Sequence, residues 1–408
     1  MNDTLAVLHA RLIDGSGAPA VEDTTVVVTD GRITAVGAGL AAPAGAEVID
    51  ATGHSVLPGL IDAHVHLGGL GFTHHPPFGG RAATDDYAAA REGALAYGVT
   101  TQRSLGDFLN DALEVREETA AGLLAGPRLL TSGPSFQVEG GHPNGTVWGG
   151  DPTTVAAAAR MPRTPADAVT MVDKLAAAGV DLIKVIISDS AFLGEPHPEL
   201  KLPWNITEAI VAAAHAHGLP VAAHVEDPVD ALRAVQLGVD DIEHLLVGRA
   251  EPPNQAVLDE LLDLMAAQAT YLVPTMIAHQ RGATAATDSR TLRYGSRLVA
   301  QAHERGVKLG VGSDAHTAGM HGWALQHEIG MMVHDQGIAP LQALSAATLG
   351  NAGLLGLGDR LGTVEAGKLG DLLIVSGRPD KDISDLARVS HVIKGGQLLV
   401  NHPEQKAS

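Results

Sequence analysis

Short apolar segments alternate with alanine-rich segments through the middle of the chain, and this alternation constrains the fold more than any other feature. Eight of the apolar segments have the length of buried strands: GLIDAHVH, TTQRSLGD, PRLLTSG, LIKVIIS, PVAAHV, DIEHLL, TYLVPT and KLGVGSD. Helical segments such as DDYAAAREGALAYG and QAVLDELLDLMAAQ intervene and end at or near a Gly or a polar residue. Strands that alternate with helices are typical of βαβ units and a parallel sheet. We therefore predict an α/β fold of the (β/α)8 TIM-barrel type.

The two ends of the chain have a different pattern, with alternating apolar and polar residues cut by turn signals. TTVVVTDGRITAVGAG predicts two strands joined at Asp30-Gly31, and SHVIKGGQLLV predicts two more joined at Gly395-Gly396. GDLLIVSG has the same strand-like pattern. Because chain ends often lie close together, we expect both ends to pair in one small sheet domain.

Composition limits the partners and the kinds of site. The chain has 408 residues, with 27 Lys and Arg against 47 Asp and Glu, a formal net charge of -20 that disfavours nucleic acid and anionic membranes. It has no cysteine, which excludes thiolate metal sites and fits a reducing compartment. Neither a signal peptide nor an apolar run of about 18 residues is apparent. We predict a soluble, cytoplasmic protein with a small-molecule substrate.

The ends of the predicted strands carry residues of unusual type. In a (β/α)8 barrel the chemistry takes place at the carboxyl ends of the strands. Those ends hold His64, His66, Lys184, His224, His244 and Asp314. His64 and His66 are two apart on one strand, so they point to the same side. A single histidine would more often be a core or loop residue, but the barrel brings all six ends together.

Lys184 lies in the apolar segment LIKVIIS, where a buried ammonium would cost several kcal/mol unless it is paired or neutral. Burial lowers the pKa of a lysine, and the neutral amine is a nucleophile. It could form a Schiff base with a carbonyl substrate or a carbamate with carbon dioxide. Four imidazoles nearby favour the carbamate, an anionic oxygen donor. The alternative is that Lys184 reaches out to a surface acid.

LPGLIDAHVH, LIKVIIS, AAHVED, IEHLL and GSDAH together resemble, in order, the metal-ligand stations of the amidohydrolase superfamily. The resemblance covers nearly the whole chain. It implies a barrel over residues 58–362 and a small β-sandwich domain from residues 1–57 and 363–408. It also implies that members are commonly homo-oligomeric.

The resemblance further implies two divalent metal ions, with zinc the default and manganese, cobalt and iron left open. His64, His66 and Asp314 would bind one ion, and His224 and His244 the other. Lys184, as N6-carboxylysine, would bridge the two.

GVTTQRSLGD, GPRLLTSG, GGHPNG and LIKVIIS resemble the prolidase-like and ochratoxin-degrading branch of the superfamily. This branch implies hydrolysis of an amide bond, in N-acyl amino acids, dipeptides or related amides, by a hydroxide held between the metals. His142 would donate a hydrogen bond to the developing oxyanion, and Asp314 would be both ligand and proton carrier. GGHPNG stands where the branch usually has GGHG, so Pro143 alters the neighbouring pocket.

Three further residues are candidates for contact with substrate or support of the site. Arg103, near the end of the second strand, could hold a substrate carboxylate or pair with Asp107. His316 follows Asp314 by two residues and could support the metals or be an ordinary loop residue. His327 follows a Gly-containing loop after the eighth strand and could contact substrate.

Other functions remain open. The same site chemistry would suit a lactone, a carbamate ester or a cyclic amide, because the loops after the strands determine substrate choice. A deaminase of the superfamily would carry Glu in a His-x-x-Glu arrangement, whereas His224 is followed by Val225 and Glu226. A non-catalytic scaffold would require the loss of ligands, and all six positions are filled.

Overall fold

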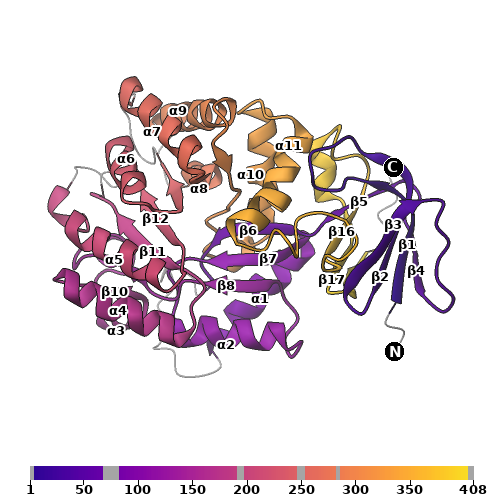
Figure 1. Ribbon diagram of the computed structural model, residues 1–408, viewed down its shortest axis with the longest axis horizontal. Coiled ribbons are helices and arrows are strands. Elements are labelled where there is room, and N and C mark those ends of the chain that lie inside the picture. The colour runs from indigo at the N-terminus through magenta and orange to yellow at the C-terminus, as the bar shows by residue number, and fades with distance from the viewer. Residues whose placement is uncertain (1–3, 68–81, 191–196, 246–252, 282–284, 403–408) are drawn as a thin grey trace.

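The computed structural model describes residues 4–67, 82–190, 197–245, 253–281 and 285–402. Within these residues, the eight predicted apolar segments form parallel strands of the barrel (Figure 1). They are β6 (Leu60–Val65), β7 (Val99–Ser104), β8 (Arg128–Thr131), β11 (Ile183–Ile187), β12 (Val221–Val225), β13 (Asp241–His244), β14 (Tyr271–Val273) and β15 (Lys308–Leu309). Five of them, β6, β7, β11, β12 and β13, are buried along their whole length, as expected for parallel strands covered on both faces.

Backbone hydrogen bonds join the strands into a ring. β6, β7 and β8 form one sheet, and β11 to β15 belong to another. At one junction, the amide of Asp181 donates to the carbonyl of Thr131 at 2.9 Å. At the other, the segment after β15 pairs with β6 through Ala63 N to Val311 O at 3.0 Å and Asp314 N to His64 O at 2.8 Å. The predicted TIM-type barrel is confirmed.

Gly312 allows the eighth barrel segment to approach β6 closely. A Cβ atom at this position would lie 2.6 Å from the Cβ of His64 and 2.8 Å from a methyl group of Val273. The segment continues past β15 without regular pairing and delivers Asp314 to the carboxyl end of β6. The predicted strand therefore ends earlier than its apolar sequence indicates, although it keeps its place in the ring.

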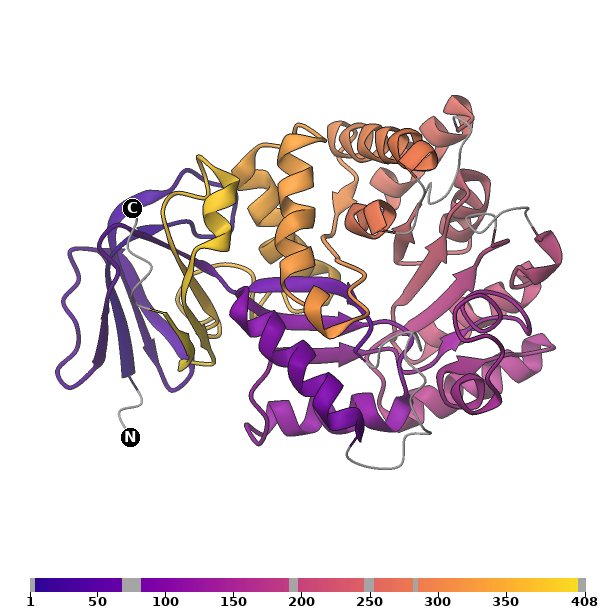
Figure 2. The ribbon, with the colours of Figure 1, turned by 180° about the vertical axis from the view of Figure 1, so that it is seen from behind.

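Helices cover the outside of the barrel (Figure 2). α4 begins with a capping box between Thr164 and Asp167, has Pro165 in its first turn and ends at Gly179 with φ of 84°. α7 buries Leu258, Leu261, Leu262 and Met265, a helical spacing that packs one face on the strands. The helices are α1 (Ala82–Ala96), α2 (Leu109–Ala120), α3 (Pro152–Ala158), α4 (Pro165–Ala178), α5 (Trp204–Ala216), α6 (Pro228–Gln236), α7 (Gln255–Gln268), α8 (Met276–Arg281), α9 (Ala285–Glu304), α10 (Trp323–His334), α11 (Pro340–Ser345) and α12 (Asn351–Leu354).

Short helical turns and short strands complete the barrel region. The turns are η2 (Pro198–Leu200), η3 (Ala318–Met320), the π-helical η4 (Ala346–Gly350) and η5 (Ile383–Ala387). Two short strands, β9 (Ser135–Phe136) and β10 (Ala159–Arg160), extend the sheet beside β11. β9, β10, α3, α8, α10, α11 and α12 are not among the predicted elements.

The two chain ends pair in one sheet, as predicted. Its order is β18-β17-β16-β5-β1-β2-β3, with β4 paired to β1. β16 pairs antiparallel with β5, so that Leu373 lies opposite Leu57. The strands are β1 (Thr4–Leu12), β2 (Val21–Thr29), β3 (Arg32–Ala38), β4 (Glu47–Asp50), β5 (His54–Pro58), β16 (Leu372–Ser376), β17 (Val389–Lys394) and β18 (Gln397–Asn401). Figure 1 shows these indigo and yellow strands together at one end of the molecule.

The turn predictions in this unit are also confirmed, since β2 and β3 join at Asp30-Gly31 and β17 and β18 at Gly395-Gly396. A separate apolar core contains residues from both ends of the chain, including Val7, Val26, Leu372 and Ile393. The division at residues 57 and 363 stays a prediction. No helix in the described ranges is both long and apolar enough to cross a membrane.

Candidate metal centre

Five imidazole rings form a continuous row at the carboxyl ends of the barrel strands. The ring centroids are 5.2 Å apart for His66 and His64, 4.9 Å for His64 and His244, and 4.4 Å for His244 and His224. His142 continues the row at 4.9 Å from His224. These residues come from β6, β12, β13 and the loop after β9, so the fold brings together residues that are far apart in sequence.

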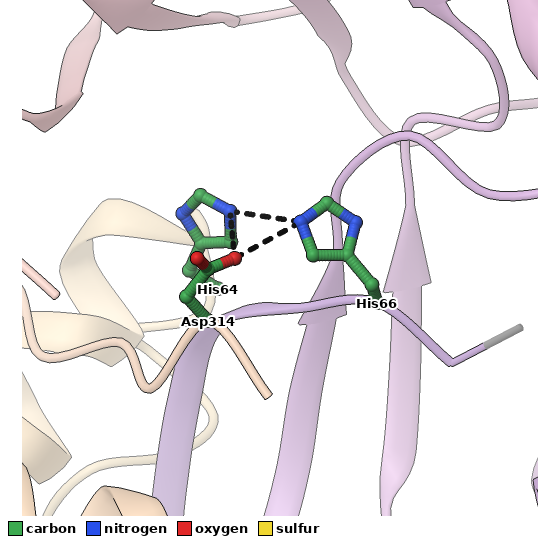
Figure 3. Close-up of side chains that lie close together, drawn as sticks. All are labelled: His64, His66 and Asp314. Atoms are coloured by element: carbon green, nitrogen blue, oxygen red, sulfur yellow. Dashed lines mark hydrogen bonds and ion pairs between the residues drawn. The ribbon is translucent and has the colours of Figure 1, made fainter. Parts of the chain in front are cut away.

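Asp314 completes a group of three metal-binding side chains at one end of this row (Figure 3). One ligand atom from each of His64, His66 and Asp314 lies within 4.8 Å of the others. Asp314 Oδ1 is 3.1 Å from His66 Nε2 and 3.4 Å from His64 Nε2. Two imidazoles and a carboxylate suit a divalent cation such as zinc.

Three of the imidazoles each make a hydrogen bond, through one ring nitrogen, with a residue outside the row. His64 Nδ1 lies 2.5 Å from Glu243 Oε2, and His244 Nδ1 lies 2.7 Å from Thr275 Oγ1. His224 Nε2 lies 2.7 Å from Glu226 Oε1. A metal-binding histidine ordinarily makes such a bond with its second nitrogen, which fixes the ring and its tautomer. The donor set therefore fits metal binding by His64, His244 and His224.

Burial favours the neutral form of His64 and His244, the form that metal binding requires. Burial is the main cause that lowers the pKa of His64 and His244 well below the usual value. Lys184 lowers the pKa of His64 further, and His224 does the same for His244. Burial opposes ionisation of Asp314, but the hydrogen bond with His66 and the neighbouring imidazoles lower its pKa well below the usual value. The site thus combines neutral nitrogens with an ionised carboxylate.

Lys184 is buried beneath this row, with its side chain 1% exposed. Its Nζ atom has no hydrogen-bond partner within the described part of the chain. Burial lowers its pKa to about 8, although Glu243 and Asp241 act in the opposite direction. The prediction that Lys184 is a buried amine is confirmed, and the alternative that it reaches a surface acid is wrong. A buried amine without a partner fits a lysine that is modified in the working protein.

Asp62 connects the strand that carries His64 with the segment that carries Asp314. Its carboxylate accepts hydrogen bonds from Ser313 N at 3.0 Å, Ser313 Oγ at 2.6 Å and His64 N at 3.3 Å. Burial raises the pKa of Asp62 to about 7, partly offset by these bonds. Asp62 therefore positions the two ligand-bearing segments against each other.

Arg103 supports the site from below instead of facing substrate. Its side chain is 3% exposed, and its two terminal nitrogens lie 2.5 Å from Asp241 and 2.5 Å from Glu243. Its Nε donates to the carbonyl of Ala63 at 2.6 Å. These contacts engage all three guanidinium nitrogens of a buried side chain, so the predicted contact with a substrate carboxylate has no support. Arg103 also pairs with Asp241 and Glu243 instead of Asp107, so the predicted ion pair with Asp107 is wrong.

His142 and His316 are two further candidates, and each makes a hydrogen bond through Nδ1. His142 is half-buried, and its Nδ1 lies 2.7 Å from Thr146 Oγ1. Burial and the nearby His224 lower the pKa of His142 well below its usual value. His316 is also half-buried, and its Nδ1 lies 2.8 Å from the carbonyl oxygen of Asp314.

His327 is placed apart from the row. It is exposed on α10, stacks on Trp323 at 5.4 Å and lines a pocket of about 420 Å³ together with Ile383 and Leu386 of η5. The buried face of α10 contains Leu325, Glu328 and Ile329, and position 327 falls outside it. This position gives no support to the predicted substrate contact.

Several residues at the strand ends have a backbone conformation that L-amino acids rarely adopt. φ is 73° at His244, 69° at Leu245, 46° at Thr275 and 50° at Asp314. Such conformations cost about 1–3 kcal/mol each and concentrate at functional sites. Two of the six predicted ligands are among them, which supports a functional role for this end of the barrel.

Comparison with known proteins decides the family. The Amidohydrolase family matches residues 55–399. The chain belongs to this family. The predicted superfamily and the predicted class, a hydrolase acting on carbon–nitrogen bonds, are confirmed.

Individual relatives of this amidohydrolase match nearly the whole chain. An imidazolonepropionase from Symbiobacterium thermophilum is 25% identical over 98% of this chain and 97% of its own. The solved structure of a Xaa-Pro dipeptidase with bound methionine has a TM-score of 0.80 and 27% identity, and covers 97% of this chain and 99% of that one. Ochratoxinase from A. niger shares the fold, with a TM-score of 0.80 and 20% identity over 98% of this chain and 97% of that one. The predicted resemblance to prolidase-like members is confirmed by the dipeptidase match, whereas the ochratoxinase match shows the shared fold alone.

Three residues that make hydrogen bonds with the predicted metal-binding histidines of this amidohydrolase were not predicted. Glu243, Thr275 and Glu226 each bond a predicted ligand, yet none was assigned a role. Glu243 and Glu226 had a usable signal, because each is a carboxylate within two residues of a histidine at a strand end. Thr275 had none, since its contact with His244 depends on how β13 and β14 end.

Proposed function

We propose that this amidohydrolase uses two divalent metal ions to cleave the amide bond of a dipeptide, an N-acyl amino acid or a related amide. His64, His66 and Asp314 would hold one ion, and His224 and His244 the other. Lys184, carboxylated on Nζ, would lie between them. The observation that carries the proposal is the buried amine of Lys184, which has no hydrogen-bond partner among the described residues, near a continuous row of imidazoles.

Divalent ions at these ligands would polarise a carbonyl group and lower the pKa of bound water from about 15.7 towards 7. The protein's own groups would do the rest. Asp314 Oδ2 makes no hydrogen bond within the described residues, so it can take a proton from water and pass it to the leaving nitrogen.

His142 is the group we assign to the developing oxyanion. Its ring lies 4.9 Å from that of His224 at one end of the row, and Thr146 Oγ1 holds its Nδ1. If Nδ1 is the acceptor in that bond, Nε2 carries the proton and can donate it to an oxygen of the substrate. A single donor of this kind is worth about 10²–10³ in kcat.

Xaa-Pro dipeptides are the first substrates to test, because the Xaa-Pro dipeptidase structure matches nearly the whole chain at 27% identity. The assay would use protein reconstituted with zinc or manganese in bicarbonate. The panel would contain Xaa-Pro dipeptides, N-acyl amino acids, lactones and carbamate esters. Hydrolysis of the first two classes at the highest kcat/KM is the expected result, and turnover of lactones alone would contradict the proposal.

A cyclic amide is the second candidate, favoured by the full-length match to an imidazolonepropionase. The imidazolone after which that enzyme is named therefore belongs in the same panel. Turnover of this compound without turnover of any dipeptide or N-acyl amino acid would favour the second candidate. The zinc preference, the cytoplasmic location and the homo-oligomer stay predictions.

A further inference from the structure

Glu226 lies just beyond the end of β12, two residues after His224, and its side chain is 2% exposed. Its Oε1 atom accepts two hydrogen bonds, from His224 Nε2 at 2.7 Å and from Ser188 Oγ at 2.6 Å. Ser188 follows β11, is 2% exposed and accepts a bond from the amide of Ser190 at 3.0 Å. Ser188 therefore fixes the carboxylate, and the carboxylate fixes the imidazole.

The bond to Glu226 determines which nitrogen of His224 is available. Because Nε2 of His224 is engaged by the Glu226 carboxyl group, Nδ1 is the ring nitrogen left for another partner. For His64 and His244 the arrangement is reversed, because Nδ1 is the nitrogen that bonds Glu243 or Thr275, and Nε2 of His64 faces Asp314. Glu226 therefore leaves Nδ1 of His224 for a metal ion, whereas Glu243 leaves Nε2 of His64.

The charge around the two carboxylates also differs. Arg103 neutralises Glu243 at 2.5 Å. Among the residues that the structure describes, Glu226 has no Lys or Arg within ion-pair distance. A buried carboxylate without a cation is unfavourable. A metal ion bound by His224 would supply the missing positive charge.

We infer that Glu226 is a positioning residue for the second metal ion. It holds His224 with Nδ1 directed at the ion, and its negative charge strengthens His224 as a ligand. Ser188 keeps the carboxylate in place. The inference rests on the two-metal site of the proposed function and adds two residues to it.

The test is a metal titration of the full-length protein after its metal has been removed, in buffer with bicarbonate and with Co²⁺ as the probe. Calorimetry and the visible spectrum of Co²⁺ would follow binding to the wild type, Glu226→Gln and Ser188→Ala. Asp173→Asn is the matched control, because Asp173 Oδ1 lies 2.7 Å from His217 Nε2 in the same kind of pair on the exposed surface. Thermal unfolding of each metal-free variant would show that it is folded.

We expect the wild type and Asp173→Asn to bind two ions with the same affinities. Glu226→Gln should weaken one of the two binding steps by about 10–100-fold and leave the other unchanged. Ser188→Ala should weaken the same binding step by a smaller factor. If Glu226→Gln does not fold, the result for Ser188→Ala tests the inference.

Three results would overturn the inference. If the wild type binds two ions and neither variant changes either step, Glu226 does not position His224, while the proposed function stands. If a folded variant weakens both metal-binding steps equally, the substitution does not act through His224 alone, and the inference is wrong. If the wild type binds a single ion, the proposed function fails and the inference fails with it.

Discussion

Arg103 and Glu243 form a buried ion pair directly beneath His64. The guanidinium nitrogen lies 2.5 Å from Glu243 Oε1, and the other carboxylate oxygen lies 2.5 Å from His64 Nδ1. His64, a predicted metal ligand, is therefore held through one carboxylate by a cation in the barrel interior. Asp241 shares the same cation at 2.5 Å.

Replacing Arg103 with Met should lower the stability of the protein strongly. The substitution leaves Asp241 and Glu243 buried without their cation, which costs about 3–5 kcal/mol. Chemical unfolding of the two proteins measures this difference. Arg305→Met is the matched control, since Arg305 also pairs with two aspartates, Asp259 and Asp263, but on the surface. The control should lose less than about 1 kcal/mol. A stable Arg103→Met protein with a raised KM for a carboxylate substrate would show instead that Arg103 binds substrate.

His142→Ala should lower kcat by about 10²–10³ on the best substrate of the panel and leave metal content unchanged. The physical reason is the loss of one hydrogen bond that is made to the oxyanion and not to the ground-state carbonyl. Steady-state kinetics with metal analysis would test this. An effect confined to KM would show that His142 contributes to binding only.

Glu328 should make the protein less stable as the pH rises. Its carboxylate is buried and accepts from Met276 N at 2.9 Å and Ile277 N at 2.7 Å, and burial raises its pKa to about 7. Between the unfolded pKa near 4.5 and the folded pKa near 7, the folded state holds a proton that the unfolded state has lost. Stability therefore falls with pH in this window, by about 1.4 kcal/mol per pH unit from this group.

Glu328→Gln removes this ionisation, so its unfolding free energy should fall less steeply between pH 5 and 7 than that of the wild type, by roughly 1 kcal/mol per pH unit. Averaged over this pH range, the unfolding free energy of the variant should be lower than that of the wild type. The reason is that the amide offers one acceptor oxygen to two backbone N–H groups. Denaturant unfolding at several pH values gives the two slopes. Parallel slopes would mean that Glu328 is ionised at all these pH values.

The sequence predicts the barrel well because its strands are buried on both faces and its helices are amphipathic, so local pattern and tertiary structure agree. The six predicted ligands are found at the expected strand ends because residues at equivalent positions of parallel strands converge in a barrel. His64 and His66 show this most clearly, since their spacing alone places both on one side of β6.

The supporting contacts could not be predicted in the same way. Arg103 was interpreted as a residue facing substrate or pairing with Asp107, because the sequence does not show which strand its long side chain crosses. Its partners, Asp241 and Glu243, come from β13, well over a hundred residues away. His327 was considered a substrate contact because it follows the Gly-containing loop after the eighth strand, whereas the packing of α10 decides which way its side chain points.

The central claim is that a modified Lys184 and the imidazole row hold two metal ions. The most direct test is metal stoichiometry per chain after reconstitution with and without bicarbonate, for the wild type and Lys184→Ala. We predict two ions per wild-type chain with bicarbonate, fewer than two without it, and at most one in Lys184→Ala under either condition. One ion per wild-type chain at saturating metal and bicarbonate, with an unchanged count in Lys184→Ala, would contradict the account.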